Sequence, residues 1–198
     1  MKIGVVGGTF DPVHLGHIAM AEAAAACAGL DRVLLIPSNV PPHRSAAMAS
    51  AADRLEMTRL AAVGHPRLEI SDIELRRPGP SYTVDTLRQL KTERPDDELC
   101  LVLGWDAARD IRAWRSPDEL MHLAGLVIVT RPGYSHPSPA ELAAAGIDAA
   151  RVEICDAPTP DVESTDVRRL IEEGGSLQGA VDPAVELYIR GRGLYLAP

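Results

Sequence analysis

Aromatic residues are scarce in this chain, and positive charge is outnumbered by negative charge. Only 4% of the residues are Phe, Trp or Tyr, so the stacking platforms that bind single-stranded nucleic acid are few. Lys and Arg number 20 against 28 Asp and Glu, and the net charge of −8 argues against broad contact with nucleic acid or an anionic membrane. Any anionic ligand must therefore be bound at a local basic site.

Cysteine and long apolar runs are scarce as well. Cys27, Cys100 and Cys155 lie far apart, with neither a CxxC pair nor metal-ligand spacing, so we expect buried or incidental thiols and no metal site. The chain opens on MKIGVVG without a signal-peptide core, and no apolar run reaches the roughly 18 residues of a membrane span. These absences predict a protein of the cytoplasm with reduced thiols and no membrane segment.

Short β-branched stretches alternate with helical stretches along nearly the whole chain. Strands are expected at 3–6, 32–37, 67–75 (one strand or two), 99–104, 126–130 and 151–155, and helices at 15–28, 51–63, 83–93, 105–111, 117–122, 165–173 and 183–190. The alternation predicts a Rossmann-like α/β fold, a doubly wound and mostly parallel sheet with helices on both faces. We expect one domain over residues 1–198, with 156–198 as a C-terminal helical extension packed on the sheet. Loops at 40–50 and 132–139 are candidate walls of a ligand site.

The segment richest in chemistry is GGTFDPVHLGH, residues 7–17, between the first strand and the first helix. Gly7 and Gly8 allow a tight turn and the close approach of an anion to the backbone. His14 and His17 are three residues apart, so both can face one side of the helix, whose first free amides attract phosphate. The segment suits a polyphosphate, although a histidine at a helix start can also be a cap or a surface residue.

This segment resembles the TxxH…HxGH signature of a nucleotidyltransferase superfamily, and further motifs match the bacterial nicotinate-mononucleotide adenylyltransferases. Those motifs, which extend the resemblance from about residue 3 to residue 195, are NVPPHR (39–44), PSYT (80–83), GWD (104–106), Trp114, Glu119–Leu120, TRPGY (130–134), and Ser164–Thr165 with Arg168. HxGH alone is specific for the superfamily only. The resemblance implies that ATP and nicotinate mononucleotide are joined into nicotinate adenine dinucleotide, with release of pyrophosphate, in NAD biosynthesis. Mg²⁺ is expected to accompany ATP.

The resemblance also implies roles for individual residues. The catalytic residues are His14, His17 and Arg44; the ATP-binding residues are Gly7, Gly8, Thr9, Phe10, His14, Gly16, His17, Ser164, Thr165 and Arg168; and the residues that bind nicotinate mononucleotide are Tyr82, Thr83, Asp106, Trp114 and Arg131. The family commonly has a second serine where this chain has Glu163. A carboxylate beside a triphosphate is repulsive unless it faces away or binds the metal.

Several of these residues also have a purely structural interpretation. Ser81 or Thr83 is a natural N-cap, and so is Asp106. Trp114 can belong to the core. Arg44 can be an exposed loop residue, and Arg168 with Arg169 can form a solvated helix face.

Three alternative functions are weighed against the adenylyl transfer. They are a phosphopantetheine adenylyltransferase of the same superfamily, a nucleotide-binding module without turnover, and a nucleic-acid binder, which the charge of −8 disfavours. The expected partners are ATP and nicotinate mononucleotide, with no nucleic acid and no membrane. The sequence leaves a homo-oligomer open.

Overall fold

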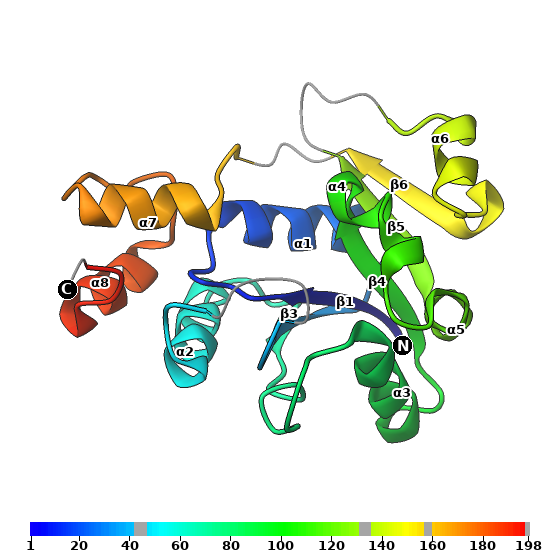
Figure 1. The fold of residues 1–198 in the computed structure, drawn as a ribbon, viewed down its shortest axis with the longest axis horizontal. Coiled ribbons are helices and arrows are strands. Elements are labelled where there is room, and N and C mark those ends of the chain that lie inside the picture. Colours follow the sequence, from blue (N-terminus) through cyan, green and yellow to red (C-terminus); the bar gives the residue numbers. More distant parts are fainter. Residues whose placement is uncertain (42–46, 131–135, 157–159, 197–198) are drawn as a thin grey trace.

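A computed structural model describes residues 1–41, 47–130, 136–156 and 160–196. Within them, β1 (Lys2–Gly8), β2 (Arg32–Pro37), β3 (Leu68–Ile70), β4 (Glu98–Gly104), β5 (Gly125–Thr130) and β6 (Val152–Asp156) form one sheet (Figure 1). The strand order is β3-β2-β1-β4-β5-β6, and every neighbouring pair is parallel. This is the predicted Rossmann-like, doubly wound sheet.

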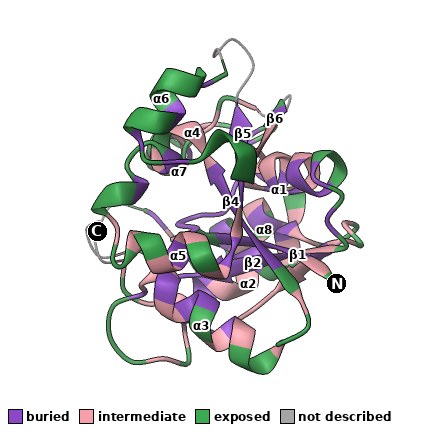
Figure 2. Ribbon diagram, turned by 90° about the vertical axis from the view of Figure 1, so that its right-hand side faces the viewer, coloured by how far each residue is buried: buried purple, intermediate pink, exposed green. Residues whose placement is uncertain are grey.

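The sheet separates two hydrophobic layers, because successive side chains of a strand point to opposite faces. In β4, Leu99, Leu101 and Leu103 join one cluster, whereas Cys100 and Val102 join the other. The central strands are therefore apolar along nearly their whole length, as expected of a parallel sheet covered on both faces. Figure 2 shows this buried centre between exposed outer helix faces.

Helices cover both faces of the sheet. They are α1 (Leu15–Cys27), α2 (Ala51–Ala61), α3 (Thr83–Glu93), α4 (Trp105–Ala108), α5 (Pro117–Leu123), α6 (Pro139–Ala144), α7 (Ser164–Glu172) and α8 (Pro183–Arg192), with 3₁₀ turns η1 (Ile111–Ala113) and η2 (Ala149–Arg151). The apolar faces of α1, α2, α7 and α8 lie in one hydrophobic cluster, and those of α3, α5 and α6 lie in the other. No helix in the described part of the chain is long and apolar enough to cross a bilayer.

Three elements differ from the sequence prediction. The helix expected at 105–111 is only α4 (Trp105–Ala108), and the separate 3₁₀ turn η1 (Ile111–Ala113) follows it. The strand expected at 67–75 is only three residues long, because the chain turns after Ile70, with amides donating from Arg76 to Asp72 and from Arg77 to Glu74. Helix α6 was not predicted. It begins in a capping box in which the Ser138 hydroxyl accepts from the amide of Glu141 and the Glu141 carboxylate accepts from the amide of Ser138.

The C-terminal helices pack against α1 and α2. Val167 and Ile171 of α7, with Val185 and Ile189 of α8, share the hydrophobic cluster of α1. At the rim of this contact, Tyr188 donates its hydroxyl to Asp53 of α2 at 2.9 Å. The description of residues 1–198 as one domain with an extension from 156 stays a prediction.

The expectation of three thiols is wrong for two of them. Cys27, the last residue of α1, and Cys155 in β6 form a disulfide with their Cα atoms 5.9 Å apart, while Cys100 is free and buried. The two are 128 residues apart in sequence, and only the packing of α1 beside β6 brings them together. The disulfide between these two cysteines could therefore not be predicted from their spacing along the chain.

Candidate active site at the carboxyl end of the sheet

The candidate site lies where β1 and β4 end side by side. β2 and β3 lie on one side of this central pair, and β5 and β6 lie on the other. Crossovers therefore leave in opposite directions from β1 and β4 and open a crevice beyond their carboxyl ends, the usual ligand site of such sheets. The turn at residues 7–17 follows β1, and Asp106 follows β4.

Two glycines of the first turn are required by close contacts. A Cβ on Gly8 would lie 2.8 Å from the Phe10 ring, and a Cβ on Gly16 would lie 3.0 Å from Nδ1 of His14 and 3.3 Å from the Pro160 carbonyl. A Cβ on Gly7 would meet nothing within 4 Å. Phe10 itself has a φ of +49°, a conformation rare for a bulky residue. The turn is thus tightly constrained between Gly8 and Gly16.

The structure brings the two predicted histidines into contact. The rings of His14 and His17 are stacked with centroids 3.6 Å apart, and the Phe10 ring meets His17 edge-on at 4.9 Å. Nδ1 of His17 accepts a hydrogen bond from the backbone amide of His14 at 3.3 Å. Neutral His17 therefore carries its proton on Nε2, which makes that atom the hydrogen-bond donor of the ring.

The start of α1 offers fewer amides than expected. The Leu15 amide donates to the Ala180 carbonyl at 2.9 Å, and the His17 amide donates to the His14 carbonyl at 3.0 Å. The prediction of free first-turn amides is wrong at these two positions, because the segment before α8 and the turn itself supply the acceptors. An anion at this helix start would therefore meet fewer free amides than predicted.

Helix α7 reaches this turn from the far end of the sequence, and Figure 1 shows it beside the N-terminal end of α1. The Ser164 hydroxyl donates to the Pro12 carbonyl at 2.9 Å, and Nη1 of Arg168 donates to the Asp11 carbonyl at 2.6 Å. A guanidinium has five N–H donors, so Arg168 can hold the loop and still offer donors to an anion. Thr165 and Glu163 are exposed at the helix start.

The carboxylate of Asp11 accepts hydrogen bonds from within the protein. It accepts hydrogen bonds from the amides of Met48 and Ala49 at 2.7 and 3.0 Å, and from the Tyr195 hydroxyl at 2.8 Å. Burial of the Tyr195 ring, together with this carboxylate, raises the pKa of the tyrosine, which therefore stays a donor. Asp11 ties the loop to the segment before α2 and to the C-terminus.

A second group of residues lies at the ends of β2 and β3. The Asn39 amide donates to the Ser81 hydroxyl at 2.9 Å, and the Ser81 amide donates to the Val40 carbonyl at 2.8 Å. The N-cap of α3 is Tyr82, so the structural interpretation of Ser81 or Thr83 as N-cap is wrong. The Ser81 side chain is instead engaged by the turn after β2. This link places Tyr82 and Thr83 beside that turn.

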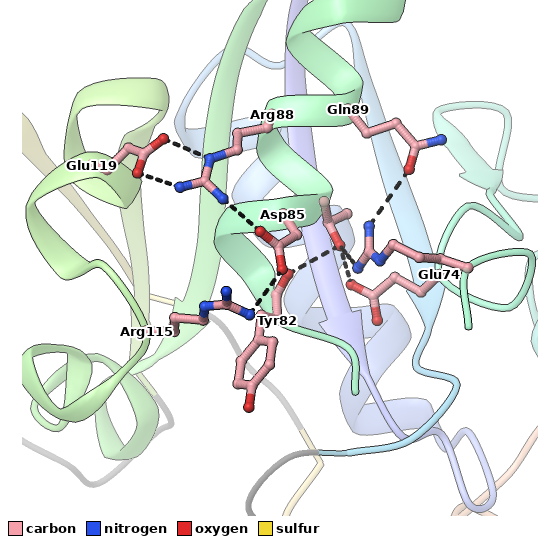
Figure 3. Close-up of polar contacts among 9 residues, drawn as sticks. Glu74, Tyr82, Asp85, Arg88, Gln89, Arg115 and Glu119 are labelled. Atoms are coloured by element: carbon pink, nitrogen blue, oxygen red, sulfur yellow. Dashed lines mark hydrogen bonds and ion pairs between the residues drawn. The ribbon is translucent and has the colours of Figure 1, made fainter. Parts of the chain in front are cut away.

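Charged side chains surround Tyr82 (Figure 3). The Arg115 guanidinium lies 4.5 Å from the centre of the Tyr82 ring, and Asp85 contacts both Arg115 and Arg88. On the other side of α3, Glu74 is 5% exposed and accepts a hydrogen bond from Thr86 at 2.6 Å. Burial raises the pKa of the Glu74 carboxyl, and the hydrogen bond from Thr86 opposes that shift.

Asp106 and Trp114 lie beyond β4. Helix α4 begins at Trp105 with Gly104 as its N-cap, so the interpretation of Asp106 as an N-cap is wrong. The exposed Asp106 carboxylate folds back over Gly104, where an added Cβ would lie 2.5 Å from it. Trp114 is half-buried and packs against the same hydrophobic cluster as Tyr82. An exposed carboxylate thus follows the end of β4, and a half-buried aromatic ring follows η1.

Two predicted site residues, Arg44 and Arg131, lie outside the described residues, as does the first half, 132–135, of the expected loop at 132–139. One buried residue of the site was missed from the sequence. Arg54 of α2 is 1% exposed and donates to the Thr9 carbonyl at 2.7 Å. The signal was its register, because the buried residues Arg54, Met57, Thr58 and Ala61 of α2 follow the i, i+3, i+4, i+7 spacing of a core-facing stripe.

The comparisons with known proteins first define the class. A family model described as cytidylyltransferase-like matches residues 5–170. The solved structure of Plasmodium falciparum nicotinic acid mononucleotide adenylyltransferase complexed with NaAD matches this chain with a TM-score of 0.82 at 17% identity, over 98% of this chain and 97% of that one. At that identity the likeness shows the fold alone, while the family model gives the class, cytidylyltransferase-like.

Curated relatives narrow the class further. A protein of Synechococcus sp. (strain JA-3-3Ab) is 46% identical over 100% of this chain and 96% of its own length. A protein of Thermus thermophilus is 45% identical over 98% of this chain and 100% of its own. Both are named "probable nicotinate-nucleotide adenylyltransferase". This chain belongs to the nicotinate-nucleotide adenylyltransferase family of cytidylyltransferase-like proteins.

Proposed function

We propose that this chain joins ATP and nicotinate mononucleotide to give nicotinate adenine dinucleotide and pyrophosphate, a step of NAD biosynthesis. Family membership supports the reaction. The observation that carries it in the structure is the meeting of the stacked His14–His17 pair with α7, whose Ser164 and Arg168 bind the same turn. Cationic and hydrogen-bond-donating groups thus converge at the carboxyl end of β1, where a triphosphate needs them.

The chemical step is an in-line displacement. A phosphate oxygen of the mononucleotide attacks the α-phosphorus of ATP, and the bond from that phosphorus to the oxygen bridging the β-phosphate breaks. Pyrophosphate leaves with the electron pair. The phosphate nucleophile is ionised at neutral pH, so no general base is required. The protein's part is to align two anions and to stabilise charge on the α-phosphoryl oxygens.

The stabilising groups come from the first turn of the site. In the proposal, Nε2 of His17, the His14 ring and the amides of Gly8 and Thr9 donate to the α-phosphate, with Arg44 as a further cation. Donors aimed at developing charge typically contribute about 10²- to 10³-fold each. Ser164, Thr165 and Arg168 hold the β- and γ-phosphates at the start of α7. Glu163, exposed beside them, would repel the triphosphate unless it faces away or binds the metal.

The pyridine nucleotide is assigned to the second group of residues. Amides near Tyr82 and Thr83 receive the nicotinate carboxylate, Trp114 stacks on the ring, and Asp106 binds ribose hydroxyls; Arg131 contacts phosphate. A carboxylate accepts two N–H bonds, whereas a carboxamide would direct a donor at them, which costs about 1–3 kcal/mol.

Mg²⁺ is proposed to arrive with ATP and to neutralise its phosphates. The described side chains around the turn suit this, because they are imidazole, hydroxyl and guanidinium groups, and the Asp11 carboxylate is occupied by three donors. No cluster of three or more His, Cys, Asp or Glu that could hold a metal occurs within residues 1–41, 47–130, 136–156 and 160–196. A phosphate-bound Mg²⁺ commonly needs few protein ligands.

We propose that the partners are these two small molecules, without nucleic acid or membrane, and that the enzyme acts in the cytoplasm. A homo-oligomer stays open. Cell fractionation with antibody detection tests the location, and sedimentation of the purified chain tests the oligomeric state.

Pyrophosphate release tests the activity itself. ATP is offered with nicotinate mononucleotide, nicotinamide mononucleotide or phosphopantetheine in separate assays. The acid mononucleotide should be the best acceptor, with the amide lower by about 10- to 100-fold in kcat/KM, as a loss of 1–3 kcal/mol predicts. Preference for phosphopantetheine would contradict the proposal, and no release with any acceptor would favour a binding module.

A further inference from the structure

The structure assigns to Arg54 a positioning role in this reaction: we propose that its buried guanidinium holds the turn after β1 and the turn after β2 at a fixed spacing, so that ATP and its acceptor meet in line. The inference rests on the proposed function for the identity of the two substrates. Arg54 contacts neither substrate in this proposal and acts through the two turns.

The first observation is the burial of the guanidinium between two loop carbonyls. Nη1 of Arg54 donates to the Thr9 carbonyl at 2.7 Å, and Nη2 donates to the Asn39 carbonyl at 3.4 Å. Nε is buried with no hydrogen-bond partner within the described part of the chain. Burial lowers the pKa of this guanidinium, and the nearby Asp11 carboxylate opposes that shift. Burying a charge costs free energy unless hydrogen bonds or an opposite charge compensate it. An arginine at this buried position of α2 therefore calls for an explanation.

The second observation is where the two carbonyls lead. Thr9 belongs to the turn that carries the histidine pair, at the ATP end of the site. Asn39 belongs to the other end, because its amide donates to Ser81 at 2.9 Å and the Ser81 amide donates back to Val40 at 2.8 Å. Tyr82 and Thr83 follow directly. Arg54 is therefore linked to the ATP end by one hydrogen bond, and to the acceptor end by one hydrogen bond and the Asn39–Ser81 pair.

Arginine suits this position for a geometric reason. Its planar fork directs two N–H groups at two acceptors from fixed positions, whereas a lysine ammonium is a single point charge on a flexible stem. A methionine would fill similar space and remove the donor from two partly buried carbonyls. A lysine at position 54 therefore keeps the charge but cannot contact both carbonyls. Its effect on the reaction reports on positioning and not on charge.

The test compares Arg54→Lys and Arg54→Met with Arg59→Lys and Arg59→Met. Arg59 lies on the exposed face of the same helix, where it pairs with Glu56, so it controls for charge and helix propensity. We expect Arg54→Lys to lower kcat by about 100-fold, since displacements near 1 Å at reacting groups cost this much, and to raise KM for both substrates. The Arg59 variants should stay within about twofold, as surface changes usually do.

A second variant separates the link from Arg54 to Thr9 from the link through Asn39 to Ser81. Ser81→Ala removes the acceptor of the Asn39 amide and leaves the Thr9 contact intact. We expect it to raise KM for nicotinate mononucleotide about tenfold, the loss of one buried hydrogen bond, with KM for ATP unchanged. A change in both constants for Arg54→Lys and in one for Ser81→Ala would support the proposal. Equal changes in both variants would overturn it.

Folding is controlled by expressing activity per folded molecule, with the folded fraction taken from circular dichroism at the assay temperature. If folded Arg54→Lys and Arg54→Met molecules turn over as fast as the parent, Arg54 only stabilises the fold and the proposal is wrong. If the parent itself shows no turnover, the proposed function fails first. Calorimetry with a non-hydrolysable ATP analogue then decides about Arg54: weaker binding by Arg54→Lys but not by Arg59→Lys supports the role, and equal binding overturns it.

Discussion

The two ends of the proposed site are built in different ways. The ATP end comes mainly from one continuous segment, residues 7–17, to which α7 is joined by two hydrogen bonds to backbone carbonyls. The acceptor end is assembled from turns that follow β2, β3 and β4, and no single one of these turns has a distinctive chemistry. The comparison teaches that the residues proposed to bind phosphate can lie in one continuous segment, whereas those proposed to recognise the acceptor are brought together only by the tertiary structure.

The two ends also differ in how tightly they are packed. At the ATP end His14 is only 8% exposed, and added methyl groups on Gly8 and Gly16 would clash with neighbouring rings. At the acceptor end Asp106 is exposed and Trp114 is half-buried. We therefore expect substitutions at the ATP end to impair turnover, and substitutions at the acceptor end to change the affinity for one substrate.

The largest effect is expected for His17→Ala. The variant loses a donor to the charge that develops on the α-phosphate, so kcat should fall by about 10²- to 10³-fold. Steady-state pyrophosphate release measures this. His65→Ala is the control, because His65 precedes β3 at the amino end of the sheet and pairs with Glu22. Comparable rates for His17→Ala and the parent would rule out the mechanism.

Gly16→Ala should have the next largest effect. The new Cβ would press on the His14 ring at 3.0 Å and on the Pro160 carbonyl at 3.3 Å, which displaces the imidazole pair. We expect kcat/KM to fall by about 10- to 100-fold, as for other displacements of catalytic groups. Gly191→Ala serves as the control, since nothing lies within 4 Å of its added Cβ in α8. It should leave the rate unchanged and stabilise the helix by about 0.5–1 kcal/mol.

Trp114→Ala tests the other side of the comparison. Loss of a ring that stacks on the pyridine should raise KM for nicotinate mononucleotide about tenfold, since such stacking contributes about 1–3 kcal/mol. KM for ATP should not change, and Trp114→Phe should restore much of the affinity. If both Michaelis constants rise together in Trp114→Ala, the division of the site into two ends is wrong.

The smallest effect is expected from the buried Glu74. The pKa of the Glu74 carboxyl is raised in the folded protein. The stabilisation of the folded state by protonated Glu74 is therefore fully present below the ordinary pKa of 4.5, and it is lost as the pH rises through the raised pKa. Glu74→Gln keeps an acceptor for Thr86 without a charge. The stability of Glu74→Gln relative to the parent should therefore increase with pH across this window. Thermal melts at a series of pH values measure the difference, and a constant difference would contradict the account.

The sequence predicted most of the fold because strands and helices alternate with clear hydrophobic periods. It failed where structure depends on partners far along the chain. The residues next to Ser81 in the sequence suggest that it caps a helix, but its hydroxyl accepts a hydrogen bond from the turn after β2 instead. The short β3 was overestimated because Ile73 is buried outside any strand, 1% exposed. Local alternation cannot tell a strand from a turn that packs one apolar side chain.

Some residues of the candidate site could be named from the sequence, and others could not. The histidine pair followed from a spacing of three residues, and Ser164 and Arg168 followed from family resemblance rather than from any local pattern. Arg54 escaped notice because an arginine in a helix is usually solvated, and only the burial of its stripe in α2 shows otherwise. Roles that act through backbone carbonyls leave no motif, since any residue can supply the carbonyl.

The disulfide between Cys27 and Cys155 divides the chain in an unexpected way. It closes a covalent ring that contains β2 to β5 and therefore the whole acceptor end. The histidine turn and α7 lie on the two tails outside this ring, one before Cys27 and one after Cys155. The first tail also carries β1, which pairs with both β2 and β4, so fraying of both tails would dismantle ATP binding and divide the sheet while the covalent ring stayed closed. Loss of nucleotide binding together with the pairing of β2 and β4 to β1 would be the experimental mark of that architecture.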